Sequence, residues 1–174
     1  VNVKLGSMGT GTLNVRKDAQ GNISGGTGTL TLTGGVFAHA NTQIELRVDG
    51  KGGVSGSATV EGSTLTLGQL KADGSLTLKI DQSGFSGTGK LNATLGTLLT
   101  GELALMAGSD LSLVGTLKLA EGSPIPGTGA LTVTQNSAGT TIGGAIHVAY
   151  GPLTGDLQGK KDGDNYSFGG DLTI

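Results

Sequence analysis

Residues able to do acid–base chemistry are few in this chain. His39 and His147 are its two histidines, and it contains no cysteine. His147 lies between Ile146 and Val148 in a segment where apolar and polar residues alternate, which places it on the polar face of a strand. His39 lies in an irregular stretch. We interpret both histidines as exposed surface residues, and we expect no catalytic residue and no enzyme activity.

Residues 84–91 nearly match a phosphate-binding loop. The loop motif ends in Gly-Lys-Ser/Thr, because the hydroxyl binds magnesium, and a helix should follow it. Here Leu91 takes the place of the hydroxyl residue, and Ala93 and Leu95 continue an alternating pattern. The segment is therefore predicted to be a strand, without a nucleotide site.

A metal site is not expected either. Without cysteine there are no thiolate ligands. The run Asp162-Gly163-Asp164-Asn165 resembles the start of a calcium loop. However, Tyr166 stands where an acid or Asn is needed, and no Glu follows at the required spacing. We interpret the run as a solvated turn, and no cofactor is predicted.

Composition restricts the class of protein. The chain has 174 residues, a size typical of one domain, so we treat residues 1–174 as a single domain. The net charge of −2 argues against nucleic acid as a partner, because nucleic-acid binding requires a basic face. No apolar run approaches the roughly 20 residues of a membrane helix, so no membrane span is expected. Glycine accounts for 35 residues, far above the usual share of about 7%.

An alternation of period two organises the whole chain. In residues 85–95, Phe85, Leu91 and Leu95 share one face with glycine and alanine, and the other face is polar, as in a half-buried strand. Asp73-Gly74 is predicted to form a tight hairpin, because type I′ turns need positive φ. Comparable strands are predicted at residues 8–16, 26–32, 44–48, 54–60, 65–67, 76–80, 99–105, 111–119, 127–133, 142–148, 153–157 and 166–174.

This repeat predicts an all-β fold. Short Gly-rich turns favour antiparallel neighbours, so we expect an antiparallel Gly-rich β-repeat meander folded into a flattened sandwich or roll, with a closed barrel as the alternative. Strand glycines share a face with Leu and Val. We therefore expect Gly87, Gly101, Gly115 and Gly144 to point inward and to let two facing layers of backbone approach closely. The chain begins within an alternating segment, so we interpret it as a fragment of a larger protein.

Threonine rows form the most regular polar surface. Thr27, Thr29, Thr31 and Thr33 alternate along one segment, and the pairs Thr64/Thr66 and Thr132/Thr134 repeat the pattern. Threonine is a favoured strand residue, but regular threonine arrays also occur on ice-binding faces. A surface that binds glycan or ice is therefore one alternative function.

The segments Gly-Thr-Gly-Thr-Leu, Ser-Gly-Thr-Gly-Lys-Leu-Asn-Ala-Thr-Leu and Thr-Gly-Glu-Leu-Ala-Leu resemble the Gly/Thr-rich β-repeat regions of large bacterial secreted proteins, some of which accompany toxin-delivery systems. The resemblance implies a non-enzymatic structural module, secreted or at the cell surface, with flanking domains of the same polypeptide and other subunits as partners. The alternating Gly and Leu strands also resemble AsmA-like lipid-transfer proteins. That resemblance implies a lipid-binding groove and a periplasmic location.

Overall fold

The computed structural model describes residues 1–106, 112–136, 139–162 and 165–173, and it confirms the all-β prediction. Within these residues one 14-stranded sheet contains every strand, in the order β1 to β13, with β14 also pairing with β12. All the strand pairs are antiparallel. The strands are β1 (Asn2–Leu5), β2 (Gly9–Lys17), β3 (Ile23–Leu32), β4 (Thr42–Val48), β5 (Val54–Glu61), β6 (Leu70–Asp81), β7 (Gly84–Leu95), β8 (Leu99–Met106), β9 (Ser112–Leu119), β10 (Gly127–Asn136), β11 (Gly139–Tyr150), β12 (Leu153–Asp162), β13 (Asn165–Gly169) and β14 (Leu172–Thr173).

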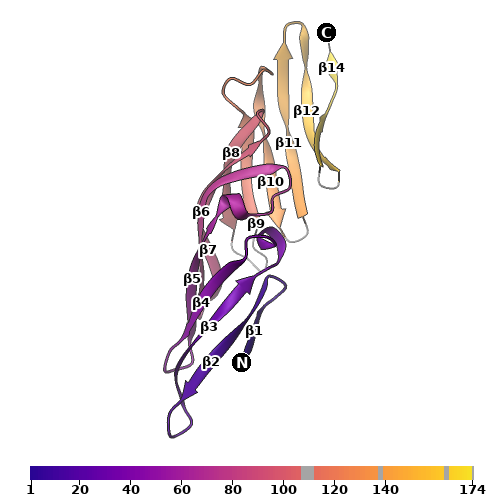
Figure 1. The fold of residues 1–174 in the computed structure, drawn as a ribbon. Helices are drawn as coiled ribbons and strands as arrows, with labels where there is room; N and C mark the ends of the chain where they lie inside the picture. The colour runs from indigo at the N-terminus through magenta and orange to yellow at the C-terminus, as the bar shows by residue number, and fades with distance from the viewer. Residues whose placement is uncertain (107–111, 137–138, 163–164, 174) are drawn as a thin grey trace.

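The sheet is long and curls over on itself instead of forming two separate layers (Figure 1). The two ends of the meander lie at opposite ends of an elongated molecule. Alternation decides which side chains line the concave face: in β4 the residues Ile44, Leu46 and Val48 are buried, whereas Glu45 and Arg47 are exposed. The curl is therefore a roll with an apolar inside and a polar outside.

Strand β7 shows how the repeat is used. Its Leu91 and Ala93 are fully buried, while Lys90 and Asn92 are exposed, as the alternation predicts. It pairs with β6 along its whole length, from Leu70 opposite Leu95 to Asp81 opposite Gly84, and with β8 on its other side. The phosphate-loop-like residues 84–91 are thus an ordinary strand in the middle of the sheet.

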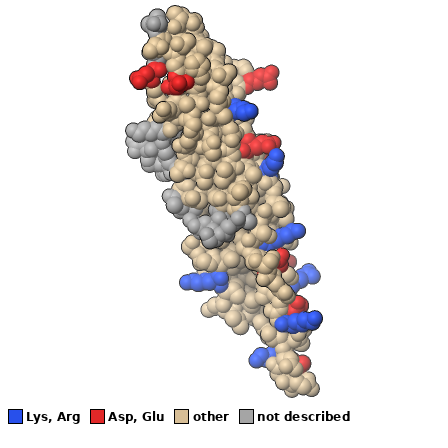
Figure 2. Space-filling view, turned by 180° about the vertical axis from the view of Figure 1, so that it is seen from behind, with Lys and Arg blue, Asp and Glu red and all other residues tan. Residues whose placement is uncertain are grey.

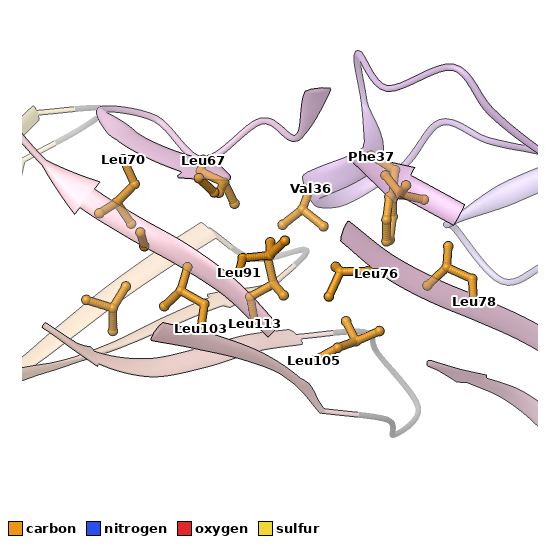
Figure 3. Close-up of a cluster of buried hydrophobic side chains, with 14 of the residues drawn as sticks. Val36, Phe37, Leu67, Leu70, Leu76, Leu78, Leu91, Leu103, Leu105 and Leu113 are labelled. Atoms are coloured by element: carbon orange, nitrogen blue, oxygen red, sulfur yellow. The ribbon is translucent and has the colours of Figure 1, made fainter. Parts of the chain in front are cut away.

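Two connections fold inward and cover the concave face. The segments contain short 3-10 helices, η1 (Gly35–Phe37) and η2 (Gly62–Thr64). Val36, Phe37 and Leu67 are 3%, 1% and 2% exposed, and Figure 3 shows them converging with leucines of the sheet. The Thr66 N–H donates to the Val36 carbonyl at 2.8 Å, which joins the two connections. Because η1 also contacts β10, the cover links distant parts of the chain. We call Val36, Phe37 and Leu67 the apolar cover.

Two sequence predictions are wrong in this region. Asp73 and Gly74 do not form a hairpin; they lie inside β6, where Gly74 has φ 108° and sits opposite Leu91. Residues 65–67 are not a strand, because they belong to the β5–β6 connection that carries Leu67 into the core. In both cases the local sequence pattern is present, but the tertiary structure uses the residues differently: Gly74 within a strand and Leu67 in a connection.

The reason for the strand glycines also differs from the prediction. Gly101 and Gly115 are half-buried, but a Cβ at Gly101 would overlap the carbonyl of Thr116, and one at Gly115 the carbonyl of Glu102. Both carbonyls belong to the neighbouring strand of the same sheet. Gly144 is exposed, with φ 91°. The close approach is therefore between adjacent strands, although at Gly87 a Cβ would meet the side chains of Leu105 and Leu78 on the inner face.

Candidate functional site

His147 and Asp156 form the one histidine–carboxylate pair within the described residues. They lie directly opposite each other on β11 and β12, and His147 Nδ1 is 3.0 Å from Asp156 Oδ1. The two side chains are 53% and 65% exposed, so water surrounds the pair. The sequence alone did not suggest Asp156, but the Gly151-Pro152 turn fixes this register, since Tyr150 pairs with Leu153 around it.

A hydroxyl, an imidazole and a carboxylate stand in one row across three strands. Thr128 of β10 lies opposite His147, which lies opposite Asp156. This order of groups is that of a nucleophile, a base and an orienting acid. However, all three residues are exposed on the outer face, and among the described residues no hydrogen bond connects the Thr128 hydroxyl with His147. The three side chains are therefore arranged as a solvent-exposed row on the outer face of β10, β11 and β12.

The other candidate residues are not brought together. His39 is exposed at the end of the β3–β4 connection, and no ion pair or hydrogen bond of the described chain joins it to His147. Gly163 and Asp164 of the calcium-loop-like run lie outside the described residues. Within the residues described, no group of three or more His, Asp or Glu side chains is arranged to hold a metal ion.

Charged side chains are dispersed over the outer face. Figure 2 shows them singly or in small groups on an otherwise uncharged surface. One shallow hollow of about 450 Å3 lies over β4, β5 and β6. Its lining includes Ser55 and Ser57 together with the charged residues Glu45, Arg47, Lys79 and Asp81. The hollow has no aromatic wall for a sugar or a base, so its chemistry is that of a solvated polar surface.

Three hairpin turns at one end of the sheet each contain an aspartate that accepts hydrogen bonds from the turn. Asp49 Oδ1 accepts hydrogen bonds from the N–H groups of Lys51 and Gly53, both at 2.8 Å. The Gly53 N–H, followed by that of Lys51, lowers the pKa of Asp49 below its usual value. Asp18 and Asp81 occupy equivalent positions in their turns, and their pKa values are lowered chiefly by the Asn22 N–H and by the Ser83 hydroxyl, respectively. These carboxylates are turn-forming groups that satisfy backbone donors.

An apolar pocket lies on the concave side near the C-terminal end. It has a volume of only about 20 Å3, with no polar lining, which is room for about one water molecule. Ile125, on the proline-bearing loop between β9 and β10, projects into it beside Leu98 and Leu119. The inner face is therefore nearly filled at this position by the chain's own side chains.

The threonine rows are only partly regular. Thr10 lies opposite Thr31 and Thr12 opposite Thr29, which makes a small lattice on β2 and β3 in which Thr31 is half-buried and the other three are exposed. Thr64 and Thr66 do not continue it, because they lie in η2 and the segment after it. Thr132 and Thr134 lie opposite Thr116 and Thr141, in a part of the sheet separate from the lattice on β2 and β3.

Comparison with protein-family models, with curated proteins and with solved structures found no match. Among the described residues no helix is long and apolar enough to cross a membrane. The chain is an all-β protein that consists of one curled antiparallel meander with a packed apolar inner face.

Proposed function

We propose that this chain is a non-enzymatic structural β-repeat module of a larger secreted or surface bacterial protein, of the kind that accompanies toxin delivery. The observation that carries the proposal is the continuous 14-stranded sheet with its own side chains filling the concave face. Leu91, Leu103 and Leu117 are fully buried. An interior filled in this way favours a load-bearing element over a binding site.

The connectivity fits a spacer. From β2 to β12, each strand pairs with the strand before it and the strand after it along the chain. Length in such an array grows by adding strands, without a change in the existing contacts. A module of this kind would set the distance between the domains that flank it. In this proposal the flanking domains are its partners.

Shape and activity together test the proposal. Small-angle X-ray scattering should give a radius of gyration well above the roughly 16 Å of a compact domain of this length. The purified chain should show no hydrolytic or transfer activity in broad substrate panels. An activity lost in His39→Ala or His147→Ala, but kept in the surface control Lys51→Ala, would overturn the proposal.

A lipid-binding groove is the second candidate function. It is favoured by the single curved sheet and by the all-apolar pocket at Ile125 and Leu157. The pocket's present volume is too small for an acyl chain, so the Ile125 loop would have to move. Native mass spectrometry of the purified protein distinguishes the two functions: a structural module carries no lipid. Bound lipid that disappears in Ile125→Asp, but not in Glu121→Asp, would favour the groove.

A surface that binds glycan or ice is a third candidate, favoured by the threonine lattice on β2 and β3. Paired replacement of Thr12 and Thr29 by Ser keeps the hydroxyls but removes the methyl groups that stiffen the array. Ice-recrystallisation and glycan-array assays should show no binding by the wild type if the chain is structural. Binding that these replacements abolish would favour the surface instead.

A further inference from the structure

The ladder between β4 and β5 is the shortest in the interior of the sheet. It contains four residue pairs, from Glu45 opposite Ser57 to Val48 opposite Val54. Every other ladder between successive strands from β2 to β12 contains at least six pairs among the described residues. Both strands have a second partner, β3 and β6 respectively, so this ladder lies inside the sheet. We call the β4–β5 ladder, with the turn that joins its strands, the seam.

Hydrogen bonding shows where the seam stops. The Asp49 N–H donates to the Gly53 carbonyl at 2.9 Å, and in an antiparallel ladder hydrogen-bonded pairs alternate with pairs that share no hydrogen bond. The hydrogen-bonded pairs of the seam are therefore Arg47–Ser55 and Glu45–Ser57. Gln43 and Thr59 would form the next such pair, but the ladder ends before them, and there β4 pairs with β3 and β5 with β6. The two strands are thus joined at the turn end and part at the other end.

Side chains also contribute little to the seam. On the inner face Leu46 lies opposite Gly56, which has no side chain, and Val48 lies opposite Val54, which is only half-buried. The four inward residues of β4 are all buried, whereas Val60 is the one buried residue of β5. A region with few hydrogen bonds and few buried apolar contacts opens locally at a lower free energy than the rest of a fold.

The apolar cover bridges the seam from both sides. Val36 and Phe37 lie in the connection that precedes β4, and Leu67 lies in the connection that follows β5. The Thr66 N–H donates to the Val36 carbonyl at 2.8 Å across this division. In Figure 3 the cover converges with leucines of β6, and η1 also contacts β10. Side chains from before the seam therefore pack into the core that lies after it.

We propose that the seam is a hinge and that the apolar cover is its latch: under tension the module opens here into two halves, β2–β4 and β5–β12, while each half stays folded. This inference rests on the proposed structural role. Tension along a load-bearing meander passes through its ladders in series, so the shortest ladder opens first once the cover is withdrawn. Opening exposes Val36, Phe37 and Leu67 to water, and their reburial closes the hinge when the tension falls.

Amide exchange measures the opening on the unmodified chain. Glu45 and Ser57 are bonded to each other across the seam, and Thr77 and Thr88 occupy an equivalent hydrogen-bonded position in the long β6–β7 ladder. Local opening of the hinge should make the Glu45 and Ser57 amides exchange roughly ten-fold faster, or more, than those of Thr77 and Thr88. Equal exchange rates in the two ladders would overturn the proposal.

Two variants separate hinge opening from global unfolding. Phe37→Leu shortens the largest side chain of the latch and should speed exchange of the Glu45 and Ser57 amides several-fold, whereas the control His39→Ala, in the same connection, should not. Gly115→Ala crowds the β8–β9 ladder inside one half. It should speed exchange in the β6–β7 ladder and leave the seam amides unchanged. If Gly115→Ala speeds the seam amides equally, or Phe37→Leu does not speed them, the seam does not open by itself and the proposal fails.

Disulfide staples test the response to tension, because the chain has no native cysteine. Glu45→Cys with Ser57→Cys closes the seam, and Thr77→Cys with Thr88→Cys is the matched control within one half. The Cα atoms of such pairs lie about 5.5 Å apart, within the reach of a disulfide. Held in optical tweezers by peptide tags at its two ends, the unstapled chain should lengthen reversibly before it unfolds. The gain should be up to roughly 50 Å, the combined length of two strands at about 3.3 Å per residue.

The seam staple should remove this reversible step, and the control staple should leave it in place. A chain without the step, or one in which both staples remove it, would overturn the hinge and leave the structural role intact. An enzyme activity lost in His147→Ala would overturn the structural role without changing the response to tension.

Discussion

Gly115 of β9 lies directly opposite Leu103 of β8, and this small-to-large pairing recurs across the sheet. Gly28 lies opposite Leu13, Gly89 opposite Leu76 and Gly144 opposite Leu131. On the inside of a tight curl there is less room per side chain than on a flat sheet. A large residue can therefore be accommodated if its neighbour across the strand pair is small. Crowding across strand pairs accounts for these strand glycines, whereas turn glycines such as Gly21, Gly96 and Gly151 have positive φ and open space around them.

Replacing Gly115 by Ala should destabilise the fold. The added Cβ would overlap the Glu102 carbonyl and press on Leu103, and such overpacking costs typically about 1–3 kcal/mol. Gly143→Ala is the matched control, since a Cβ there has no neighbour within 4 Å. Its effect should be near zero or stabilising by up to about 1 kcal/mol. Urea unfolding of both variants measures the difference, and equal losses would contradict the crowding argument.

Removing the largest part of the apolar cover should be more costly. Phe37 is 1% exposed, and truncating a buried Phe to Ala costs about 3–5 kcal/mol. His39→Ala, two residues further along the same connection, changes an exposed side chain and should have little effect. Thermal unfolding monitored by circular dichroism compares the two variants. A small effect of Phe37→Ala would mean that the connection is dispensable for closing the roll.

Acid should destabilise the protein through the three turn aspartates. Hydrogen bonds in the folded state lower the pKa values of Asp18, Asp49 and Asp81. Their stabilising contribution is therefore complete above the unfolded-state pKa of about 3.9, and it is lost as the pH falls through the lower folded-state values.

Asn at all three positions provides the control for this pH dependence. An Asn side chain accepts the same backbone hydrogen bonds but does not titrate. The free energy of unfolding of the triple variant should therefore fall less between pH 7 and strongly acidic pH than that of the wild type. Equal acid sensitivity would assign the effect to other carboxylates.

The exposed pair of His147 and Asp156 should contribute little to stability. Exposed ion pairs are worth about 0.2–1 kcal/mol, and the charge on His147 is needed for this pair to be ionic. Denaturant titrations of His147→Ala and Asp156→Asn at neutral pH should give losses within that range. Lys90→Ala, which breaks the exposed ion pair with Glu102, is the comparison. A loss of several kcal/mol would indicate a role that the geometry does not show.

Local patterns in the sequence predicted most of the strands, but they missed that β6 continues through Asp73 and Gly74 and that residues 166–174 are divided between β13 and β14. The alternation in residues 85–95 predicted the limits of β7 to within one residue, and it predicted which side chains of β7 face the core. It could do so because the period of two is a property of the extended backbone itself. The same kind of alternation around Ile146 and Val148 placed His147 on the polar face of its strand. Its partner Asp156 was not named, although the register of a two-residue turn would have identified it.

Tertiary structure decided what the glycines and the connections do. Gly74 takes positive φ, as predicted, but it uses this conformation inside a long strand opposite Leu91. Residues 65–67 alternate like a strand, yet Leu67 is needed in the cover over the concave face. Alternation specifies which side of the backbone a residue faces. The curvature of the finished sheet specifies how much room it finds there, and curvature arises only when all the strands are paired.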